Sequence, residues 1–254
     1  MKMVAKNVAY EHIRRKLMVG QLKPGDAVSE LGLSKEMGIS RSPIREAICR
    51  LQSEGFIHKM EGYGAFVPVL SVREVRELFE VRASLECLAA VQAAEIIRPA
   101  EIEKLLDCCR TIRDMAMDAR RRNLKTFDEE MLYNLYQTDS LFHMTIIEAS
   151  GNRLIYRIVR DLHIMSRSLV AGLEGEYVPG SALPHDYLKH SRLVRPFQKH
   201  DPRMAGEQMR QHILGPLPEV LSNHQKWLDG LARAKLVGYS TGFADRIHRL
   251  GEVG

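Results

Sequence analysis

The chain has 254 residues, of which 45% are hydrophobic and 27% are charged, a composition typical of a soluble globular protein with one or two domains. No run approaches the roughly 20 apolar residues that a membrane helix needs, and the first residues contain no apolar stretch of the kind found in signal peptides. The four cysteines form no CxxC pair, which argues against a disulfide framework or a zinc ribbon. We therefore expect a cytoplasmic protein with reduced thiols and no membrane partner.

Residues 1–70 carry most of the excess positive charge. They contain 11 lysines and arginines against 7 acidic residues, whereas the remaining residues contain 26 against 25. A basic segment on a near-neutral chain is typical of a protein whose first domain binds a polyanion such as nucleic acid. The same charge is also compatible with an ordinary solvated surface, so charge alone leaves both interpretations open.

The spacing of apolar residues predicts three helices in this basic segment. The first covers about residues 8–18 and is followed by a Pro-Gly turn. The second covers about residues 31–37 and closes at Gly38, and the third has Pro43 at its first helical position. The third helix has an apolar face at positions i, i+3, i+4 and i+7, formed by Ile44, Ala47, Ile48 and Leu51.

Two helices joined by a short turn that contains glycine form a helix-turn-helix, whose second helix enters the major groove of DNA by its first residues. Here those residues include Ser40, Arg41, Ser42 and Arg45. The two arginines are one helical turn apart and lie off the apolar face, so both can present their guanidinium groups to a guanine edge or a phosphate. The alternative is a pair of solvated arginines on a surface helix.

Residues 56–60 and 65–69 are rich in β-forming side chains and flank a glycine-rich turn. This pattern predicts a β-hairpin directly after the third helix. The segment is therefore interpreted as a winged helix-turn-helix.

The same segment resembles the DNA-binding domain of the GntR family of bacterial transcription regulators. The resemblance covers about residues 8–69 and rests on five motifs, Leu22-Lys-Pro-Gly-Asp, Gly38-Ile-Ser-Arg-Ser-Pro-Ile-Arg-Glu-Ala-Ile, Arg50-Leu51, Glu54-Gly55-Phe56 and Gly64-Ala-Phe-Val. It implies that Ser40, Arg41, Ser42 and Arg45 contact DNA from the recognition helix, and that Tyr63 and Gly64 contact it from the wing tip. Gly32 and Ser34 depart from the family, which usually has better helix formers there.

From residue 71 onward the apolar spacing is that of helices. It predicts six of them, over about residues 75–88, 102–109, 132–147, 152–173, 184–199 and 202–221. The predicted fold is thus mainly α, with an N-terminal winged helix-turn-helix and a C-terminal all-α six-helix antiparallel bundle. The predicted domains are residues 1–70, residues 71–230 and a tail of unknown role at residues 231–254.

Four residues of the helical segment are candidate metal ligands. Asp139 and His143 are four residues apart, which places them on one face of a helix, and His190 and His212 belong to two further helices. One carboxylate and three imidazoles suit a first-row metal ion. Each histidine could alternatively be a hydrogen-bonded core or surface residue, and we rank His163 and His200 below these four.

The helical segment resembles the FCD ligand-binding domain of FadR-type GntR regulators, and six helices suggest the VanR-like branch. The resemblance rests on Asp139-Ser-Leu-Phe-His143, Ile147-Glu-Ala-Ser-Gly-Asn152, Glu80-Val-Arg82-Ala-Ser-Leu-Glu86 and Met209-Arg-Gln-His212-Ile213. It implies that Asp139, His143, His190 and His212 bind a divalent metal ion, with zinc as first choice and nickel or manganese as alternatives.

The resemblance further implies that Arg82 faces the same cavity and binds a carboxylate effector, with Asn152 as a second candidate contact. The alternative for Arg82 is a helix-surface ion pair with Glu86. Pro196 departs from the family and is expected to kink the helix after His190, which would change the direction of that ligand.

These observations predict a transcription regulator, not an enzyme. We expect a homodimer that binds a palindromic double-stranded DNA operator and whose operator affinity is controlled by a small organic acid at a metal-containing pocket. One alternative is a metal-dependent hydrolase-type enzyme, for which Glu86 and Glu148 would be the nearby carboxylates. The other is a regulator with a purely structural metal ion.

Overall fold

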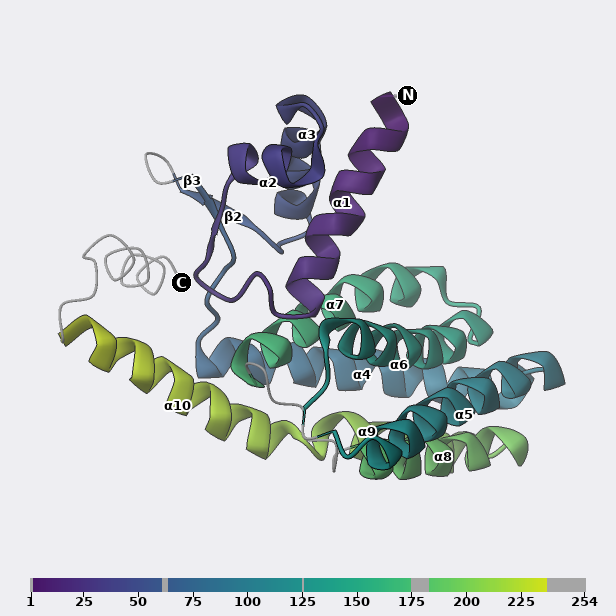
Figure 1. The fold of residues 1–254 in the computed structure, drawn as a ribbon. Coiled ribbons are helices and arrows are strands. Elements are labelled where there is room, and N and C mark those ends of the chain that lie inside the picture. Colours follow the sequence, from purple (N-terminus) through teal and green to yellow (C-terminus); the bar gives the residue numbers. More distant parts are fainter. Residues whose placement is uncertain (1, 61–63, 125, 175–182, 237–254) are drawn as a thin grey trace. The chain divides into compact units, whose positions relative to one another are not determined.

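The computed structural model describes residues 2–60, 64–124, 126–174 and 183–236, and these form two compact units (Figure 1). The first unit comprises Met1–Glu74 together with Arg167–Leu173 and the chain from Ser222 onward, and the second comprises Val75–Ser166 and Glu174–Leu221. Among the described helices, none is both long enough and apolar enough to cross a membrane.

The first unit begins with three helices, α1 (Lys2–Met18), α2 (Glu30–Met37) and α3 (Arg41–Ser53). Ser29 caps α2 by accepting a hydrogen bond from the backbone of Gly32, and Gly38 ends the helix with a φ of 64°, a conformation that favours glycine. α3 begins two residues earlier than predicted, so Pro43 lies within the first turn rather than at the first position. The first turn tolerates proline because its N–H groups have no partner inside the helix.

The predicted apolar face of α3 is the core of this unit. Ile44, Ala47, Ile48 and Leu51 are all buried, as are Ala9, Ile13 and Leu17 of α1. α3 packs on α1 and on α2, so the start of α3 remains at the surface. The helix-turn-helix is therefore held together by the residues that predicted it.

The wing is a small antiparallel sheet with the strand order β1-β3-β2. Its strands are β1 (Ala27–Val28), β2 (His58–Met60) and β3 (Gly64–Phe66). β2 pairs with β3 so that His58 faces Phe66 and Met60 faces Gly64. Gly64 has a φ of 87°, which a residue with a side chain rarely adopts, and Tyr63 lies outside the described residues.

Seven helices follow the wing in the described part of the chain, and not the six predicted. They are α4 (Val72–Ile96), α5 (Pro99–Arg121), α6 (Glu129–Ala149), α7 (Arg153–Glu174), α8 (Leu183–Gln198), α9 (Pro202–Leu214) and α10 (Leu217–Leu236). The helix predicted over residues 202–221 is broken after Gly215, because Pro216 has no N–H to continue the hydrogen-bond ladder. The predicted bundle thus corresponds to the six helices α4–α9, and residues 217–221, predicted as the end of its last helix, belong instead to α10, most of which is in the first unit.

The buried face of α4 combines alanines with two charged residues. Arg82 is 5% exposed and Glu86 is fully buried, whereas the apolar side chains of Val81 and Leu88 lie at the surface. Ala89 of α4 forms a core cluster with Met144 and Ile147 of α6 and with residues of α7. α5 also packs on α6 and α8, and α8 packs on α9. Asp139 and His143 of α6 and His190 of α8 are buried among these helices.

Candidate metal centre and DNA-facing surface

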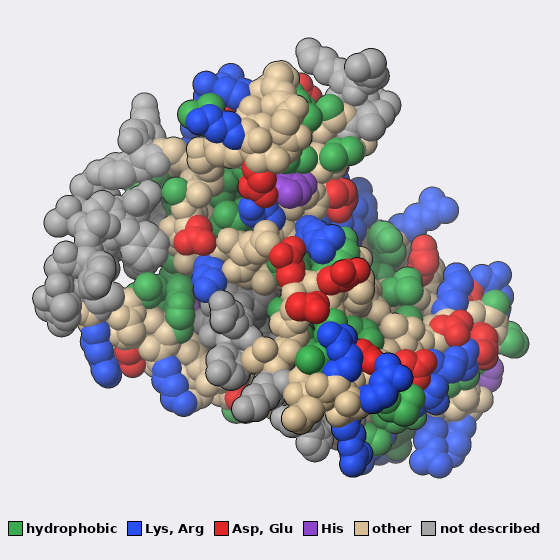
Figure 2. Space-filling view, in the orientation of Figure 1, with side chains coloured by type: hydrophobic (Ala, Val, Ile, Leu, Met, Phe, Trp, Pro, Cys, Tyr) green, Lys and Arg blue, Asp and Glu red, His purple; other side chains and the backbone are tan. Residues whose placement is uncertain are grey.

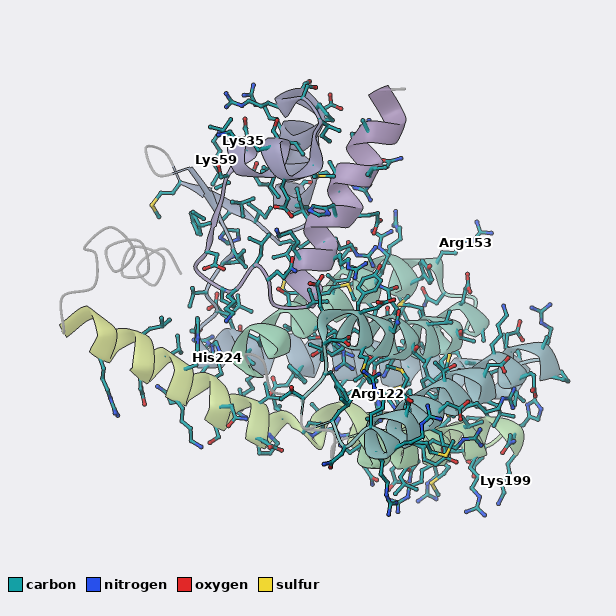
Figure 3. The ribbon with its side chains drawn as sticks, in the orientation of Figure 1. Lys35, Lys59, Arg122, Arg153, Lys199 and His224 are labelled. Carbon is teal, nitrogen blue, oxygen red and sulfur yellow. The ribbon has the colours of Figure 1, made fainter. Side chains whose placement is uncertain are left out.

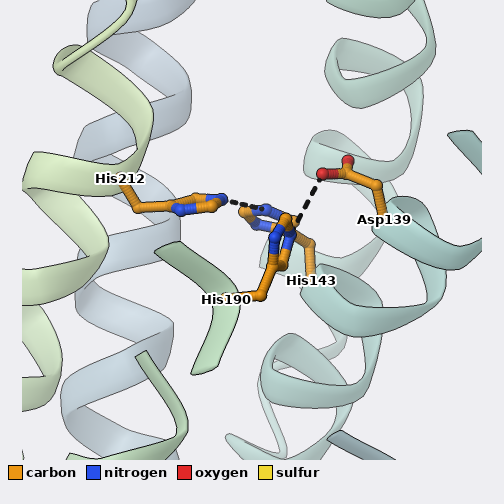
Figure 4. Close-up of side chains that lie close together, drawn as sticks. All are labelled: Asp139, His143, His190 and His212. Carbon is orange, nitrogen blue, oxygen red and sulfur yellow. Dashed lines mark hydrogen bonds and ion pairs between the residues drawn. The ribbon is translucent and has the colours of Figure 1, made fainter. Parts of the chain in front are cut away.

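The four predicted metal ligands converge in the second unit (Figure 4). α6 supplies Asp139 and His143, α8 supplies His190 and α9 supplies His212. Each residue offers one ligand atom, and these atoms all lie within 4.8 Å of one another. The ligand atoms of a tetrahedral zinc ion lie roughly 3.4 Å apart, so these four side chains would have to move only slightly to bind one ion. One carboxylate and three imidazoles in this arrangement fit a divalent transition metal ion.

Pro196 does not prevent His190 from reaching the cluster. α8 continues through Pro196 to Gln198, and Nε2 of His190 lies 3.2 Å from Oδ1 of Asp139. The buried ring of Phe142 packs edge-on against the His190 ring, with 4.8 Å between the centroids. This contact helps to fix the direction of the imidazole.

Glu86 orients the imidazole ring of His143 through a contact at its Nδ1 atom. Its Oε2 atom lies 2.6 Å from Nδ1 of His143, and its Oε1 atom accepts a hydrogen bond from Nε of Arg82 at 2.9 Å. Burial alone would raise the pKa of Glu86, but the charge of Arg82 and the bond to His143 hold that pKa well below its usual range. The ionised carboxylate can only accept a hydrogen bond, so it favours the proton on Nδ1 of His143 and leaves Nε2, the atom that faces the cluster, as the metal-binding nitrogen.

His212 completes the set from α9. Its Nε2 atom lies 3.1 Å from Nε2 of His143. Burial and the neighbouring histidines His190 and His143 lower the pKa of His212 well below that of a free histidine. A neutral imidazole is the form that binds metal, so the site favours the ligand state of this residue.

His163, which the sequence prediction ranked below the four candidate ligands, is a buried neighbour of their cluster. It is 1% exposed, and its Nε2 atom lies 3.4 Å from Oδ2 of Asp139. Burial, followed by the charge of Arg82, lowers its pKa well below the usual value. The available signal was its position on the apolar face of α7, at i+4 from the buried Val159. His200 is a separate case, because its Nδ1 atom lies 2.9 Å from the backbone oxygen of Ala94.

The two candidate effector residues have different surroundings. Arg82 does pair with Glu86, as the alternative interpretation held, but the pair is buried and Nη1 of Arg82 also donates to Oγ of Ser166 at 2.7 Å. The side-chain oxygen of Asn152 accepts from the backbone N–H groups of Leu154 and Ile155. Asn152 therefore caps the start of α7.

The carboxylates considered for an enzyme are poorly suited to act as a base. Glu86 already contacts Arg82 and His143, and Glu148 is exposed on α6. A general base for metal-bound water needs a carboxylate that is close to the metal and available to accept a proton. Neither residue meets both conditions.

The start of α3 forms an exposed basic surface in the first unit. The side chains of Arg41 and Arg45 are 57% and 61% exposed, and Ser40 and Ser42 are exposed beside them. Figure 2 shows lysine and arginine side chains on the surface of this unit. Lys35 of α2 and Lys59 of β2 add to this charge (Figure 3).

A hollow of about 530 Å³ lies between α2, α3 and the wing. The side chains of Glu30, Arg41, Arg45, Gln52 and Lys59 line it, together with Gly64. Most of the predicted DNA contacts that the structure describes thus lie around one concave surface. Its guanidinium and amide groups are suited to base edges and phosphates.

Comparisons with known proteins match both halves of the chain. Residues 5–67 match the family described as bacterial regulatory proteins, gntR family, and residues 77–215 match the FCD domain. The uncharacterized HTH-type transcriptional regulator YdhC of Bacillus subtilis is 24% identical over 206 residues, covering 81% of this chain and 84% of that protein. The gluconate operon transcriptional repressor of the same species is 30% identical over 164 residues, covering 64% and 62%.

The fold also matches a solved structure. That structure, of McbR/YncC from E. coli, superimposes with a TM-score of 0.74 at 19% sequence identity. The match covers 87% of this chain and 98% of that one.

Proposed function

Because the chain belongs to the gntR family of bacterial regulatory proteins and carries an FCD domain, it is a DNA-binding transcription regulator, and we propose that a small organic acid controls its operator affinity. The proposed site of control is the cluster of Asp139, His143, His190 and His212, holding one divalent ion. Zinc is the first choice of metal, and nickel or manganese are the alternatives. When bound, the ion would supply a Lewis-acidic position for an effector carboxylate.

The observation that carries this proposal is the link between Arg82 and the metal cluster through Glu86. One oxygen of Glu86 contacts Arg82 and the other contacts His143. An arginine binds a carboxylate through two parallel hydrogen bonds, and Arg82 has five N–H donors, of which Nε and one on Nη1 contact Glu86 and Ser166. An effector that uses the remaining donors therefore acts on a residue already coupled to a metal ligand.

The proposed DNA partner is a palindromic operator bound by a homodimer. Ser40, Arg41, Ser42 and Arg45 would read each half-site from α3, with Tyr63 and Gly64 at the wing. Exposed apolar side chains support a dimer, because Val81 and Leu88 on α4, and Leu154 and Ile158 on α7, would be covered by a second copy. We place the domain boundary near residue 70, between matches that end at residue 67 and begin at residue 77.

The test measures effector binding and operator binding together. Zinc-loaded wild-type protein and the Arg82→Lys variant are titrated by calorimetry with a panel of small mono- and dicarboxylic acids, with and without operator DNA. Lysine keeps a positive charge beside Glu86 but lacks the guanidinium fork, so Arg82→Lys should keep metal and operator binding and lose the effector response. Arg76→Lys, an exposed change on the same helix, is the matched control.

Linkage fixes the expected result for the wild type. Operator DNA should change effector affinity by the factor by which effector changes operator affinity, typically about 5- to 150-fold. Equal effector affinity with and without DNA would contradict control by this site. Binding of zinc without any organic acid response would favour the structural metal alternative.

A further inference from the structure

Glu30, the first residue of α2, is the shared partner of two arginines from α3. Its Oε2 atom accepts from Nη2 of Arg41 at 3.2 Å. Both oxygens accept from Arg45, whose Nε lies 3.1 Å from Oε1 and whose Nη2 lies 2.9 Å from Oε2. Glu30 is the least exposed of the three, at 28%. One carboxylate therefore gathers two long side chains that would otherwise sample many rotamers at the surface.

The edge of the Arg45 guanidinium that Glu30 contacts determines which N–H donors remain available to DNA. Arg45 uses Nε and Nη2, so Nη1 and the second hydrogen of Nη2 are left as a pair of parallel donors. Such a pair is the fork that binds O6 and N7 of guanine in the major groove. A fork that is already held loses less conformational entropy when it meets a base.

The charge of Glu30 acts differently on phosphates and on bases. The hydrogen bond from Arg45 is the main cause that holds the pKa of Glu30 below its usual range, so the carboxylate is ionised. A phosphate must compete with this carboxylate for the arginines and is repelled by it, whereas a base edge carries no net charge. Contacts to phosphates alone, which carry no sequence information, are therefore weakened more than contacts to bases.

We propose that Glu30 is a specificity-determining residue, which holds Arg41 and Arg45 for base edges and lowers the affinity for DNA of unrelated sequence. The inference rests on the proposed role of these two arginines in DNA binding and deepens it. Glu30 acts through the arginines, and therefore as a positioning residue. It raises the ratio of specific to non-specific affinity in two ways, because it weakens binding to DNA of unrelated sequence and strengthens binding to the operator.

The test compares Glu30→Gln with Glu46→Gln. Glu46 is exposed on α3 and its carboxylate lies 3.9 Å from Lys6, so Glu46→Gln removes the same charge from a neighbouring position of the helix-turn-helix without changing a residue that contacts the arginine pair. The probes are a duplex that the wild type selects from a random-sequence pool and a shuffled duplex of equal length. Dissociation constants are measured for both at several salt concentrations.

Glu30→Gln should bind the shuffled duplex more tightly, by about 3- to 10-fold, with a salt dependence steeper by about one ion. The ratio between selected and shuffled duplex should fall by about tenfold, the order expected when one bidentate base contact is loosened. Glu46→Gln should leave that ratio at the wild-type value.

An unchanged ratio in Glu30→Gln overturns the inference, and so does an equal fall in both variants, because a general charge effect would then explain it. If the wild type selects no sequence, or if Arg41→Ala and Arg45→Ala bind the selected duplex as well as the wild type, the proposed role of the arginines fails with it. The wild type can prove selective and the two arginine variants can bind the selected duplex weakly while Glu30→Gln keeps the wild-type ratio of the two affinities. In that case only the inference about Glu30 fails.

Discussion

The carboxylate of Glu86 lies 2.6 Å from Nδ1 of His143, and both side chains are buried. This single contact decides which nitrogen of His143 carries the proton and therefore which nitrogen faces the other candidate ligands. Because the second oxygen of Glu86 contacts Arg82, the same carboxylate joins the candidate metal ligand to the candidate effector residue.

Glu86→Gln should weaken zinc binding by about 10- to 100-fold, the usual effect of losing a residue that orients a metal ligand. Glutamine offers one oxygen, whereas Arg82 and His143 each need an acceptor. If its NH₂ group faces Nδ1 of His143, the proton moves to Nε2 and that atom can no longer bind metal. Zinc affinity is measured by competition with a chromogenic chelator.

Glu80→Gln makes the same charge change at an exposed position of α4 and should bind zinc like the wild type. Wild-type zinc affinity in Glu86→Gln would show that this carboxylate does not orient His143.

His143→Ala and His212→Ala should each release the metal ion and lower thermal stability. Binding to the folded state alone adds about 2.7 kcal/mol at a metal concentration 100 times the dissociation constant. For a chain of this size that corresponds to roughly 5–10 °C in melting temperature. Metal content by elemental analysis and calorimetric melting check both effects. His200→Asn, which changes a histidine bonded to Ala94, should keep full occupancy, and full occupancy in the two alanine variants would assign the ligands elsewhere.

Arg41→Ala and Arg45→Ala should each weaken operator binding by about 5- to 100-fold at fixed salt, because each removes contacts at the exposed start of α3. The helical domain should remain folded, and its circular dichroism should not change. A fluorescence anisotropy titration gives the affinities, with Arg113→Ala on the exposed face of α5 as the control. Wild-type affinity in both variants would remove α3 from the DNA interface.

His224 should make stability fall in acid. Burial lowers its pKa, although the contact between Nε2 and the backbone oxygen of Leu70 at 2.6 Å acts in the opposite direction. The unfolded chain therefore takes up a proton near pH 6.5 that the folded chain does not, so stability present above that pH is lost below it. The loss approaches about 1.4 kcal/mol per pH unit for one such group.

Glutamine can still donate to Leu70 but does not titrate, so His224→Gln should reduce this loss between pH 7 and pH 5. Denaturant unfolding is followed by the fluorescence of Trp227, the one tryptophan of the sequence, which stacks on His224 at 5.6 Å. His58→Gln in the wing controls for the loss of an exposed histidine. If the free energy of unfolding falls equally with pH in the wild type and in His224→Gln, His224 is not the group responsible for the loss.

The sequence predicted local structure where a residue type has a single strong preference. Gly38 ends α2 as predicted, since the left-handed backbone there suits glycine, and the apolar face of α3 is buried as predicted. The break at Gly215 was missed because apolar spacing continues past it, although Pro216 was the available signal. Spacing measures which face is buried and does not by itself show where one helix becomes two.

The candidate metal site could be predicted in part for the same reason. Asp139 and His143 share a face through their spacing, but the convergence of His190 and His212 with them depends on how α8 and α9 pack. His163 and Glu86 lie at buried positions of α7 and α4 among apolar neighbours. The sequence did contain a signal for these two residues, since each is titratable and lies on the apolar face of a predicted helix. Their partners across the core could not be predicted, because those contacts depend on how the helices pack.

The contact between His224 and Leu70 also sets an order of events during synthesis of the chain. The two residues are 154 positions apart, so the backbone oxygen of Leu70 cannot receive this donor until α10 has left the ribosome. The helix-turn-helix and wing, complete by Phe66, can fold earlier, because domains generally fold from the N-terminus as they emerge. A chain released before residue 224 would therefore carry the helix-turn-helix and wing without the contact that His224 makes with Leu70.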